Sequence, residues 1–278
     1  MSDPKPLAEL AAIVTGGSGG IGWASAARLV RDGAAVLLMA RRETELEKAR
    51  AALIDACPGA EVRISAGDAS NAGDVQRALD RALAMRGRLD MIVATVGGSL
   101  GLKPLLMHDV ESFTRVIDRN LTSAFLALRY GVPPMTEGGS VVCISSVCAT
   151  LPSTHLTPYC ASKGALESLV RGAAKEFARL NVRVNAVRPG MTQAAGVTSM
   201  FGGDELRARA KQVIPLGRMG APEEIAEAVR YLAGPESKWV TGQSFAVDGG
   251  SELALNRLAD DRDTEIFGKD WPAPWGPA

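Results

Sequence analysis

A tyrosine and a lysine lie four positions apart, at Tyr159 and Lys163, in a stretch whose apolar spacing predicts a helix. Side chains four positions apart share one face of a helix, so the two groups can meet. A cation beside a phenol stabilises the phenolate, and we expect it to lower the tyrosine pKa from its usual value of about 10. Such a tyrosine can act as a general acid and base near neutral pH.

Two further polar residues could complete a site around this pair. Ser146 follows a predicted buried strand, and at the carboxyl end of a strand its hydroxyl can point into a crevice and hold a substrate oxygen. Asn120 lies in the middle of a predicted helix, where asparagine is a poor helix former, so a local kink or a bound water there would have a purpose. The candidate catalytic residues are Ser146, Tyr159, Lys163 and Asn120.

A glycine-rich segment, Thr15–Gly22, joins a predicted strand to a predicted helix. Small residues let the backbone approach a diphosphate, and the start of the helix supplies free N–H groups and a positive dipole. This order of strand, glycine-rich turn and helix is typical of dinucleotide-binding folds. The sequence therefore predicts a dinucleotide site.

The end of the second predicted strand indicates which dinucleotide binds. NAD-binding proteins of this architecture carry Asp or Glu there, on the ribose 2′-hydroxyl, but this chain has Ala40 followed by Arg41 and Arg42. Two guanidiniums can bind a 2′-phosphate with forked donors, so we expect NADP(H) in preference to NAD(H). Asp68, after the third strand, is expected to accept from the adenine amino group, to cap a helix that runs on from Ala69, or both.

The elements that must position these residues alternate between strand and helix. Continuous apolar strands are typical of a parallel sheet buried on both faces, and the alternation predicts right-handed crossovers. We expect one α/β domain over residues 1–278, a doubly wound, mostly seven-stranded parallel sheet of Rossmann type with helices on both faces. Strands are predicted at 11–15, 34–40, 62–65, 89–96, 139–145, 182–188 and 242–247, and helices at 21–31, 44–56, 72–85, 110–130, 159–180 and 223–233.

The composition argues against several kinds of partner. Lys and Arg total 31 and Asp and Glu total 31, so there is no basic surplus for nucleic acid or an anionic membrane. No apolar run approaches the roughly 18 residues of a spanning helix, and no signal peptide is recognisable, so we expect a cytoplasmic protein. Four cysteines without a CxxC pair and only two histidines argue against a metal site, and we expect the cysteines to be small buried hydrophobes.

Together these motifs resemble the short-chain dehydrogenase/reductase (SDR) superfamily, in its common single-domain form, over roughly residues 8–250. Segments 184–190, 215–218 and 247–250 also match the family pattern. The resemblance implies that Tyr159 is the general acid/base and that Ser146 polarises the carbonyl. It further implies that Lys163 lowers the pKa of the tyrosine and binds the nicotinamide ribose, and that Asn120 holds a water in a proton relay.

The resemblance implies an NADP(H)-dependent oxidoreductase that interconverts a ketone or aldehyde and an alcohol by hydride transfer, with a homotetramer or dimer as its assembly. The hydride comes from the nicotinamide, so the cofactor carries the hard chemistry. The implied nucleotide contacts are Thr15, Gly16, Ser18, Gly20, Ile21, Gly22, Arg41, Arg42, Asp68, Ala69, Gly97, Tyr159, Lys163, Pro189, Gly190 and Thr192.

The chain departs from the family pattern in two places. The family usually has Asn-Asn-Ala-Gly after strand four, whereas residues 94–97 here are Ala-Thr-Val-Gly, and loss of the first asparagine is expected to loosen the crevice. The family often has Thr where this chain has Gln193 or Ala194, so Thr192 is expected to serve the nicotinamide carboxamide instead.

Two segments lie outside the alternating pattern. Residues 191–220 are predicted to form a mobile substrate loop that closes over the site. The tail, 251–278, carries aromatic residues between prolines, and we expect it to cross to a neighbouring subunit and help close its pocket, a disordered tail being the alternative. The expected pocket residues, suited to a ketone or secondary alcohol with a ring or chain, are Leu151, Pro152, His155, Met200 and Phe201.

Two other functions remain open at this stage. A 3-oxoacyl-carrier-protein reductase would need a basic surface for an acidic carrier, and the segment Tyr130–Glu137 is not basic. A non-catalytic NADP(H) sensor would have a degraded site, whereas all four candidate catalytic residues are present. Turnover of NADPH with a thioester ketone, with a simple cyclic ketone, or with neither would separate the three.

Overall fold

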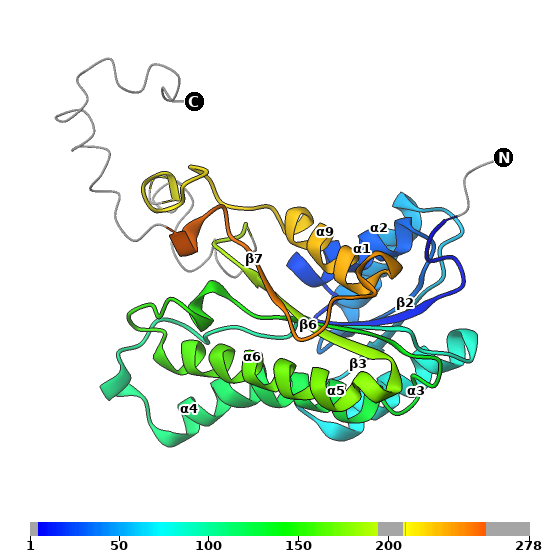
Figure 1. The fold of residues 1–278 in the computed structure, drawn as a ribbon, viewed down its shortest axis with the longest axis horizontal. Coiled ribbons are helices and arrows are strands. Elements are labelled where there is room, and N and C mark those ends of the chain that lie inside the picture. The colour runs from blue at the N-terminus through cyan, green and yellow to red at the C-terminus, as the bar shows by residue number, and fades with distance from the viewer. Residues whose placement is uncertain (1–4, 194–207, 209, 254–278) are drawn as a thin grey trace, which may run out of the picture.

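The computed structural model describes residues 5–193, 208 and 210–253, and these form one parallel sheet of seven strands (Figure 1). The strand order is β3-β2-β1-β4-β5-β6-β7. In β1, Ile13 packs in the core on one face of the sheet, and Ala12 and Val14 pack in the core on the other. The predicted doubly wound fold is confirmed. The strands are β1 (Ala11–Thr15), β2 (Ala35–Ala40), β3 (Val62–Ala66), β4 (Met91–Ala94), β5 (Gly139–Ile144), β6 (Val182–Pro189) and β7 (Ser244–Val247).

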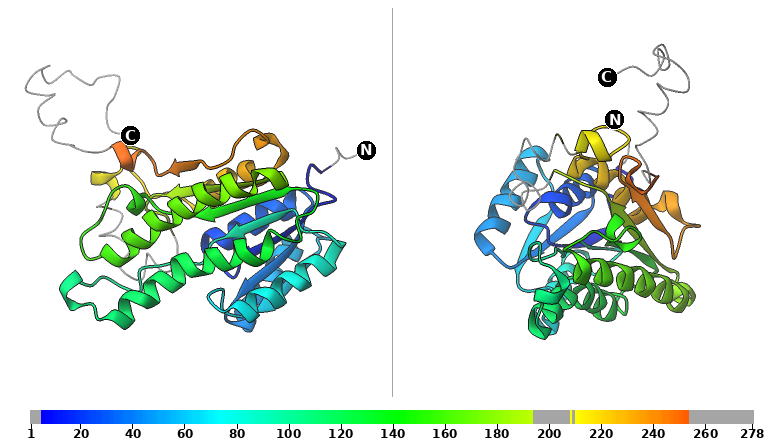
Figure 2. Two further views of the ribbon diagram at one scale, coloured as in Figure 1. Left: turned by 60° about the horizontal axis from the view of Figure 1, so that its bottom comes forward. Right: turned by 90° about the vertical axis from the view of Figure 1, so that its left-hand side faces the viewer.

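Helices cover both faces of the sheet, because each carries an apolar stripe that must be buried. On one face lie α1 (Gly20–Arg31), α2 (Glu43–Ala56) and α9 (Pro222–Ala233); on the other lie α3 (Ala72–Arg86), α4 (Val110–Ile117), α5 (Ser123–Gly131) and α6 (Thr157–Phe177) (Figure 1). Figure 2 shows the long helix α6 running beside α4 and α5. Within the described ranges, no helix has both the length and the apolar character needed to cross a membrane.

Two predicted helix details differ from the structure. The helix expected over 110–130 is interrupted by a π-helical turn at Asp118–Thr122, which is the local irregularity that Asn120 indicated. The expected capping role of Asp68 is wrong, because α3 starts only at Ala72. Its cap is Asn71, whose side chain accepts a hydrogen bond from the backbone N–H of Asp74 at 3.1 Å.

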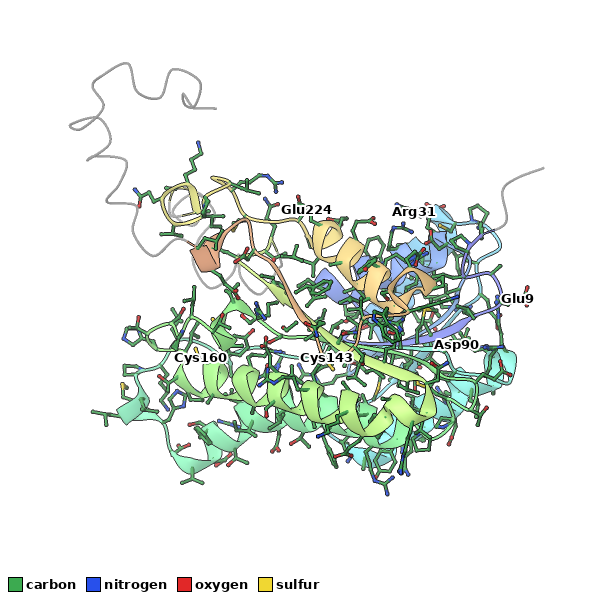
Figure 3. The ribbon with its side chains drawn as sticks, viewed as in Figure 1. Glu9, Arg31, Asp90, Cys143, Cys160 and Glu224 are labelled. Carbon is green, nitrogen blue, oxygen red and sulfur yellow. The ribbon has the colours of Figure 1, made fainter. Side chains whose placement is uncertain are left out.

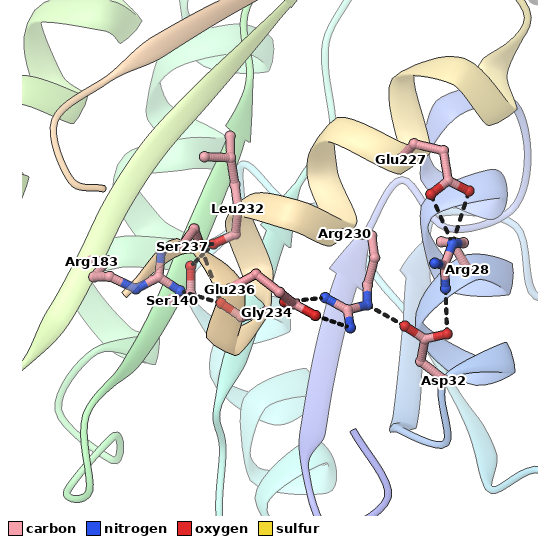
Figure 4. A network of polar contacts seen from close by, with 10 residues as sticks. All are labelled: Arg28, Asp32, Ser140, Arg183, Glu227, Arg230, Leu232, Gly234, Glu236 and Ser237. Atoms are coloured by element: carbon pink, nitrogen blue, oxygen red, sulfur yellow. Dashed lines mark hydrogen bonds and ion pairs between the residues drawn. The ribbon is translucent and has the colours of Figure 1, made fainter. Parts of the chain in front are cut away.

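A network of ion pairs joins α1 to α9 at the amino ends of the strands (Figure 4). The buried Arg230 on α9 pairs with Glu236 at 2.8 Å and with Asp32, which follows α1. Arg28 on α1 pairs with the same aspartate and with Glu227 at 2.8 Å. This network lies at the end of the sheet opposite to the carboxyl ends of the strands, where we expect the chemistry.

Two arginines donate hydrogen bonds to backbone carbonyls on the open edge of β3. Arg50 on α2 donates from Nε to the carbonyl of Val62 at 3.1 Å, and Arg81 on α3 donates from Nη1 to the carbonyl of Ile64 at 3.4 Å. Both arginines line a groove of about 350 Å³ along this strand. Because the other edge of β3 pairs with β2, the strand has partners on both sides.

Candidate active site

A cavity of about 890 Å³ opens at the carboxyl edge of the sheet, where β1 to β4 end. It brings together several nucleotide contacts that the sequence predicted from distant segments. Ligands of open α/β sheets bind in such a crevice outside the carboxyl ends of the strands. The lining residues are Gly16, Ser18, Met39, Ala40, Arg41, Arg42, Gly67, Asp68, Ala69, Ser70, Thr95, Val96, Gly97, Leu100, Arg115, Asp118 and Arg119.

The glycine-rich loop turns sharply between β1 and α1. Gly16 has φ +71°, a left-handed conformation, and a Cβ added there would lie 2.5 Å from Oγ1 of Thr95. A side chain at this position would therefore both strain the backbone and collide with the end of β4. The other predicted residues of the segment, Thr15, Gly20, Ile21 and Gly22, shape the turn and the start of α1 rather than line the cavity.

Thr95 ties the end of β4 to the end of β1. Its backbone N–H donates to Oγ1 of Thr15 at 3.2 Å, and its own hydroxyl donates to the carbonyl oxygen of Thr15. Thr95 donates both of these hydrogen bonds, which hold the ends of β1 and β4 together; whether the missing first asparagine, at Ala94, loosens the crevice stays a prediction. Sequence reasoning missed this role of Thr95, although a polar side chain directly after a buried strand is a usable signal.

The ends of β2 and β3 give the cavity opposite charges. Arg41 and Arg42, next to Ala40, line it, and so does Asp68. Partial burial raises the pKa of Asp68, but hydrogen bonds from the side chain and backbone of Ser70 and the charges of Arg41 and Arg119 hold it below its usual value. Asp68 is therefore an ionised acceptor in a cavity that is otherwise rich in guanidinium groups.

The catalytic candidates Ser146, Tyr159 and Lys163 meet beside this cavity. Nζ of Lys163, which is 1% exposed, donates to the carbonyl of Ile144 at 2.7 Å and lies 5.7 Å from the centre of the Tyr159 ring. Oγ of Ser146 accepts from the backbone N–H of Cys148 at 3.2 Å, and the serine is near enough to Tyr159 to lower the pKa of the phenol. The serine can therefore donate its own proton toward the tyrosine oxygen or a substrate oxygen.

The pKa values of this pair differ from our expectation. Burial raises the pKa of Tyr159 to about 12, although the hydrogen bond from Ser146 lowers it. Burial also lowers the pKa of Lys163 to about 8, while the nearby thiols of Cys143 and Cys148 raise it. The predicted lowering of the tyrosine pKa is thus not present in this structure, because desolvation of the buried phenol is the largest influence on it.

Asn120 anchors the loop after β4 instead of leaving its amide free. Its Oδ1 accepts from the N–H of Gly98 at 3.0 Å, and its Nδ2 donates to the carbonyls of Gly98 at 3.0 Å and Val116 at 2.8 Å. A Cβ at Gly97 would lie 2.8 Å from Oδ1 of Asn120 and 3.1 Å from Nζ of Lys163. Gly97 therefore fills the narrow space where the nucleotide cavity meets the catalytic cluster.

Arg119, the residue before Asn120, lines the cavity and was missed by the sequence reasoning. Its Nε donates to the carbonyl of Gly97 at 2.9 Å. Helix periodicity could not show where this side chain points, because the π-helical turn changes the angle between successive residues there.

The predicted contacts after β6 lie close to the end of β7. Gly190 donates its N–H to the carbonyl of Val247 at 3.1 Å and follows Pro189, the last residue of β6. Thr192 is buried, donates to the carbonyl of Gly190 at 3.0 Å and is bridged to Gly220. None of the three lines the cavity, so their contact with a nucleotide stays a prediction.

The predicted substrate residues are only partly described. Leu151, Pro152 and His155 are exposed on the segment before α6 and do not line the cavity. Met200 and Phe201, like the tail beyond residue 253, lie outside the described residues. Of the predicted substrate loop, residues 191–193, 208 and 210–220 are described, and Ile214 packs with Met219 in a small apolar cluster.

Of the four cysteines, Cys143 on β5 and Cys160 in α6 are buried (Figure 3), and Cys57 and Cys148 are half-buried. All four are free thiols. Within the described part of the chain, no three His, Cys, Asp or Glu side chains group so that they could hold a metal ion.

The residues at the carboxyl edge fit a nicotinamide dinucleotide. The cavity has room for a nucleotide, its glycine turn admits close approach of the backbone, and guanidinium groups supply charge for phosphates. The acceptor Asp68 follows β3, and the buried Lys163 bonds the carbonyl of the last residue of β5, so both lie at the carboxyl edge of the sheet. This combination fits a dinucleotide-dependent enzyme.

Comparisons with known proteins agree with this class. A family model described as Enoyl-(Acyl carrier protein) reductase matches residues 16–252. The chain is 36% identical to 7alpha-hydroxysteroid dehydrogenase of Clostridium sardiniense, over 92% of this chain and 98% of that protein. It is also 36% identical to glucose 1-dehydrogenase of Gluconobacter oxydans, over 87% and 91% respectively.

Among solved structures, an NADPH-bound short-chain oxidoreductase from Pseudomonas aeruginosa superposes with a TM-score of 0.84 at 32% identity, over 91% of this chain and 99% of that one. The chain therefore belongs to the short-chain dehydrogenase/reductase superfamily. It is an oxidoreductase of that superfamily, whose relatives act on alcohols and ketones.

Proposed function

We propose that the protein is an NADP(H)-dependent oxidoreductase that interconverts a ketone or aldehyde and an alcohol. The observation that carries the proposal is the meeting of Ser146, Tyr159 and Lys163 beside a cavity lined by Arg41 and Arg42. When bound, the nicotinamide supplies or accepts the hydride.

The preference for NADP(H) is supported by the charges at the end of β2. Ala40 leaves no carboxylate at the position where an acid would meet a ribose hydroxyl, and two guanidiniums follow it on the cavity wall. Arg42 lies at the start of α2, where a cation is unfavourable beside the helix dipole, unless an external anion offsets it. A 2′-phosphate is such an anion.

The catalytic role of each residue follows from its hydrogen bonds. Ser146 already accepts from Cys148, so its proton can be donated to the substrate oxygen and hold it beside the tyrosine. Tyr159 then gives its proton to that oxygen during reduction and takes it back during oxidation. Lys163, fixed on the carbonyl of Ile144, binds the nicotinamide ribose and, when protonated, stabilises the phenolate.

A panel of carbonyl substrates tests the proposal. NADPH oxidation is measured with cyclic ketones, linear ketones, aldehydes and a 3-oxoacyl thioester, and each active substrate is repeated with NADH. We expect turnover with at least one simple ketone or aldehyde and a higher kcat/KM with NADPH. Equal or better kinetics with NADH would refute the cofactor preference. Activity on the thioester alone would favour the carrier-protein reductase, and no turnover on any member would favour the non-catalytic sensor.

Self-association as a homotetramer or dimer and a cytoplasmic location belong to the same proposal. So does the crossing of the tail to a neighbouring subunit.

Glu252 supports an anchored start for the tail, because it accepts from Arg188 at 2.7 Å and from Thr150 at 2.9 Å. A chain ended after Leu253 keeps this anchor, and an unchanged oligomer size and KM in that shortened protein would refute the role of the tail.

A further inference from the structure

Arg119 lines the nucleotide cavity. Among the described residues, no carboxylate is hydrogen-bonded to its guanidinium. Its Nε is used by the carbonyl of Gly97 at 2.9 Å. The guanidinium lies against Gly98, where an added Cβ would be 3.4 Å from Nε and 3.7 Å from both Cζ and Nη2. The backbone of the loop after β4 thus fixes the orientation of the guanidinium plane.

The surroundings of Arg119 are unfavourable for a cation in the empty cavity. The side chain is half-buried, and burial lowers its pKa. The charge of Arg41 lowers it further, and only Asp68 acts in the opposite direction. A partly desolvated cation beside a like charge is stabilised when a ligand supplies an anion or an electron-rich face. The single bond to Gly97 explains the anchoring of this side chain but not its charge.

The two arginines of the cavity are placed for different parts of a nucleotide. Arg41 follows β2, where the ribose and its 2′-phosphate are expected. Arg119 comes from the turn between α4 and α5 and is fixed through one edge, so its planar face remains for a flat ring. Asp68, in the same cavity, can accept a hydrogen bond from an amino group on that ring.

We propose that Arg119 binds the adenine ring by stacking its guanidinium on the base, while Arg41 binds the 2′-phosphate. This inference rests on the proposed nucleotide site but not on its preference for NADP(H), because both dinucleotides contain the same ring. Arg119 is then a determinant of nucleotide affinity, and Arg41 a determinant of selectivity.

Titration calorimetry with two fragments of the cofactor separates these roles. Adenosine 5′-monophosphate carries the ring without the 2′-phosphate, and adenosine 2′,5′-bisphosphate carries both. Arg119→Met should weaken both fragments by the same factor, about 2- to 30-fold, which is the range of a cation–π contact. Arg41→Met should weaken the bisphosphate and leave the monophosphate unchanged.

Two further variants serve as controls. Arg129→Met makes the same substitution at an exposed arginine of α5 that does not line the cavity, and it should change neither affinity. Arg119→Lys keeps the charge but lacks the planar fork, so it should lose affinity as Arg119→Met does. If Arg119→Met does not fold, the affinities of Arg119→Lys test the stacking role of Arg119.

Three results would overturn the inference. These are a loss confined to the bisphosphate in Arg119→Met, no loss for either fragment, or full affinity in Arg119→Lys. The same measurements distinguish a failure of the proposed function from a failure of this inference. If the unmodified protein binds the two fragments equally, the preference for NADP(H) is wrong, and the effect of Arg119→Met on the monophosphate still decides the role of Arg119.

Discussion

Burial raises the pKa of Tyr159 and lowers the pKa of Lys163. The phenol is hard to ionise, and the amine is easy to neutralise. A proton-transfer pair in this state depends on the charges that a ligand brings into the site, since an anion near Lys163 favours its protonated form.

Replacing Tyr159 by Phe removes the transferable proton and keeps the ring. We expect kcat to fall at least about 100-fold, since general acid catalysis usually supplies that much or more. The Kd for NADPH, measured by fluorescence titration, should stay nearly unchanged. Tyr130→Phe is the matched control, because Tyr130 lies on α5 against Arg129, and it should turn over normally. Activity above about one percent in Tyr159→Phe would contradict the assignment.

Nucleotide affinity should depend on pH through Lys163. Its pKa of about 8 in the empty protein is expected to rise when an anionic dinucleotide binds. Affinity should therefore be greatest below pH 8 and weaken as pH rises above it, by at most about tenfold per pH unit. Calorimetry in buffers of different ionisation enthalpy would show proton uptake on binding. Lys163→Met should make the profile flat, and a flat profile in the unmodified protein would rule out this linkage.

At the residue scale, the sequence predicted the side chains whose chemistry shows in their type and spacing. Ser146, Tyr159 and Lys163 meet as expected, because the end of a strand and one helix face are readable from apolar periodicity. Thr95 and Arg119 were missed, since their roles depend on contacts between segments that only the folded chain brings together. The directions of the pKa shifts of Tyr159 and Lys163 could not be predicted from the sequence, because they depend on burial.

At the scale of elements, α3 shows how a cap fixes the start of a helix. Asn71→Ala should remove the hydrogen bond to the N–H of Asp74 and lower the free energy of unfolding by about 0.5–2 kcal/mol in a urea titration. Asn71→Ser keeps a capping oxygen and should lose little. Equal loss in both variants would show that the effect comes from something other than the cap.

Strand and helix types were predictable here because the strands are continuously apolar and the helices periodic. Their limits were harder to predict. Asp68 is as good a capping residue as Asn71, and only the fold shows that Asp68 holds Ser70 while α3 starts later. The π-helical turn was visible only as an asparagine in an unusual place.

At the scale of the whole molecule, the ion-pair network and the cavity lie at opposite ends of the sheet. Arg230 is 5% exposed and pairs with Asp32 and Glu236, so Arg230→Ala removes two charged hydrogen-bonded pairs, although Asp32 keeps its pair with Arg28. We expect a loss of about 1.5–3 kcal/mol in unfolding free energy with kcat/KM unchanged. Arg31→Ala, at an exposed position of α1, should cost little. A matching fall in kcat/KM for Arg230→Ala would show that the two ends are coupled.

The arginines along β3 bear on how copies of this chain can associate. An unpaired strand edge is a template on which another chain can add a strand and begin a fibre. On this edge, Arg50 and Arg81 already hold the carbonyls that an incoming strand would need. Growth of the sheet past β3 would first have to displace two guanidinium groups, so these arginines oppose amyloid-like extension at this edge while the protein remains folded.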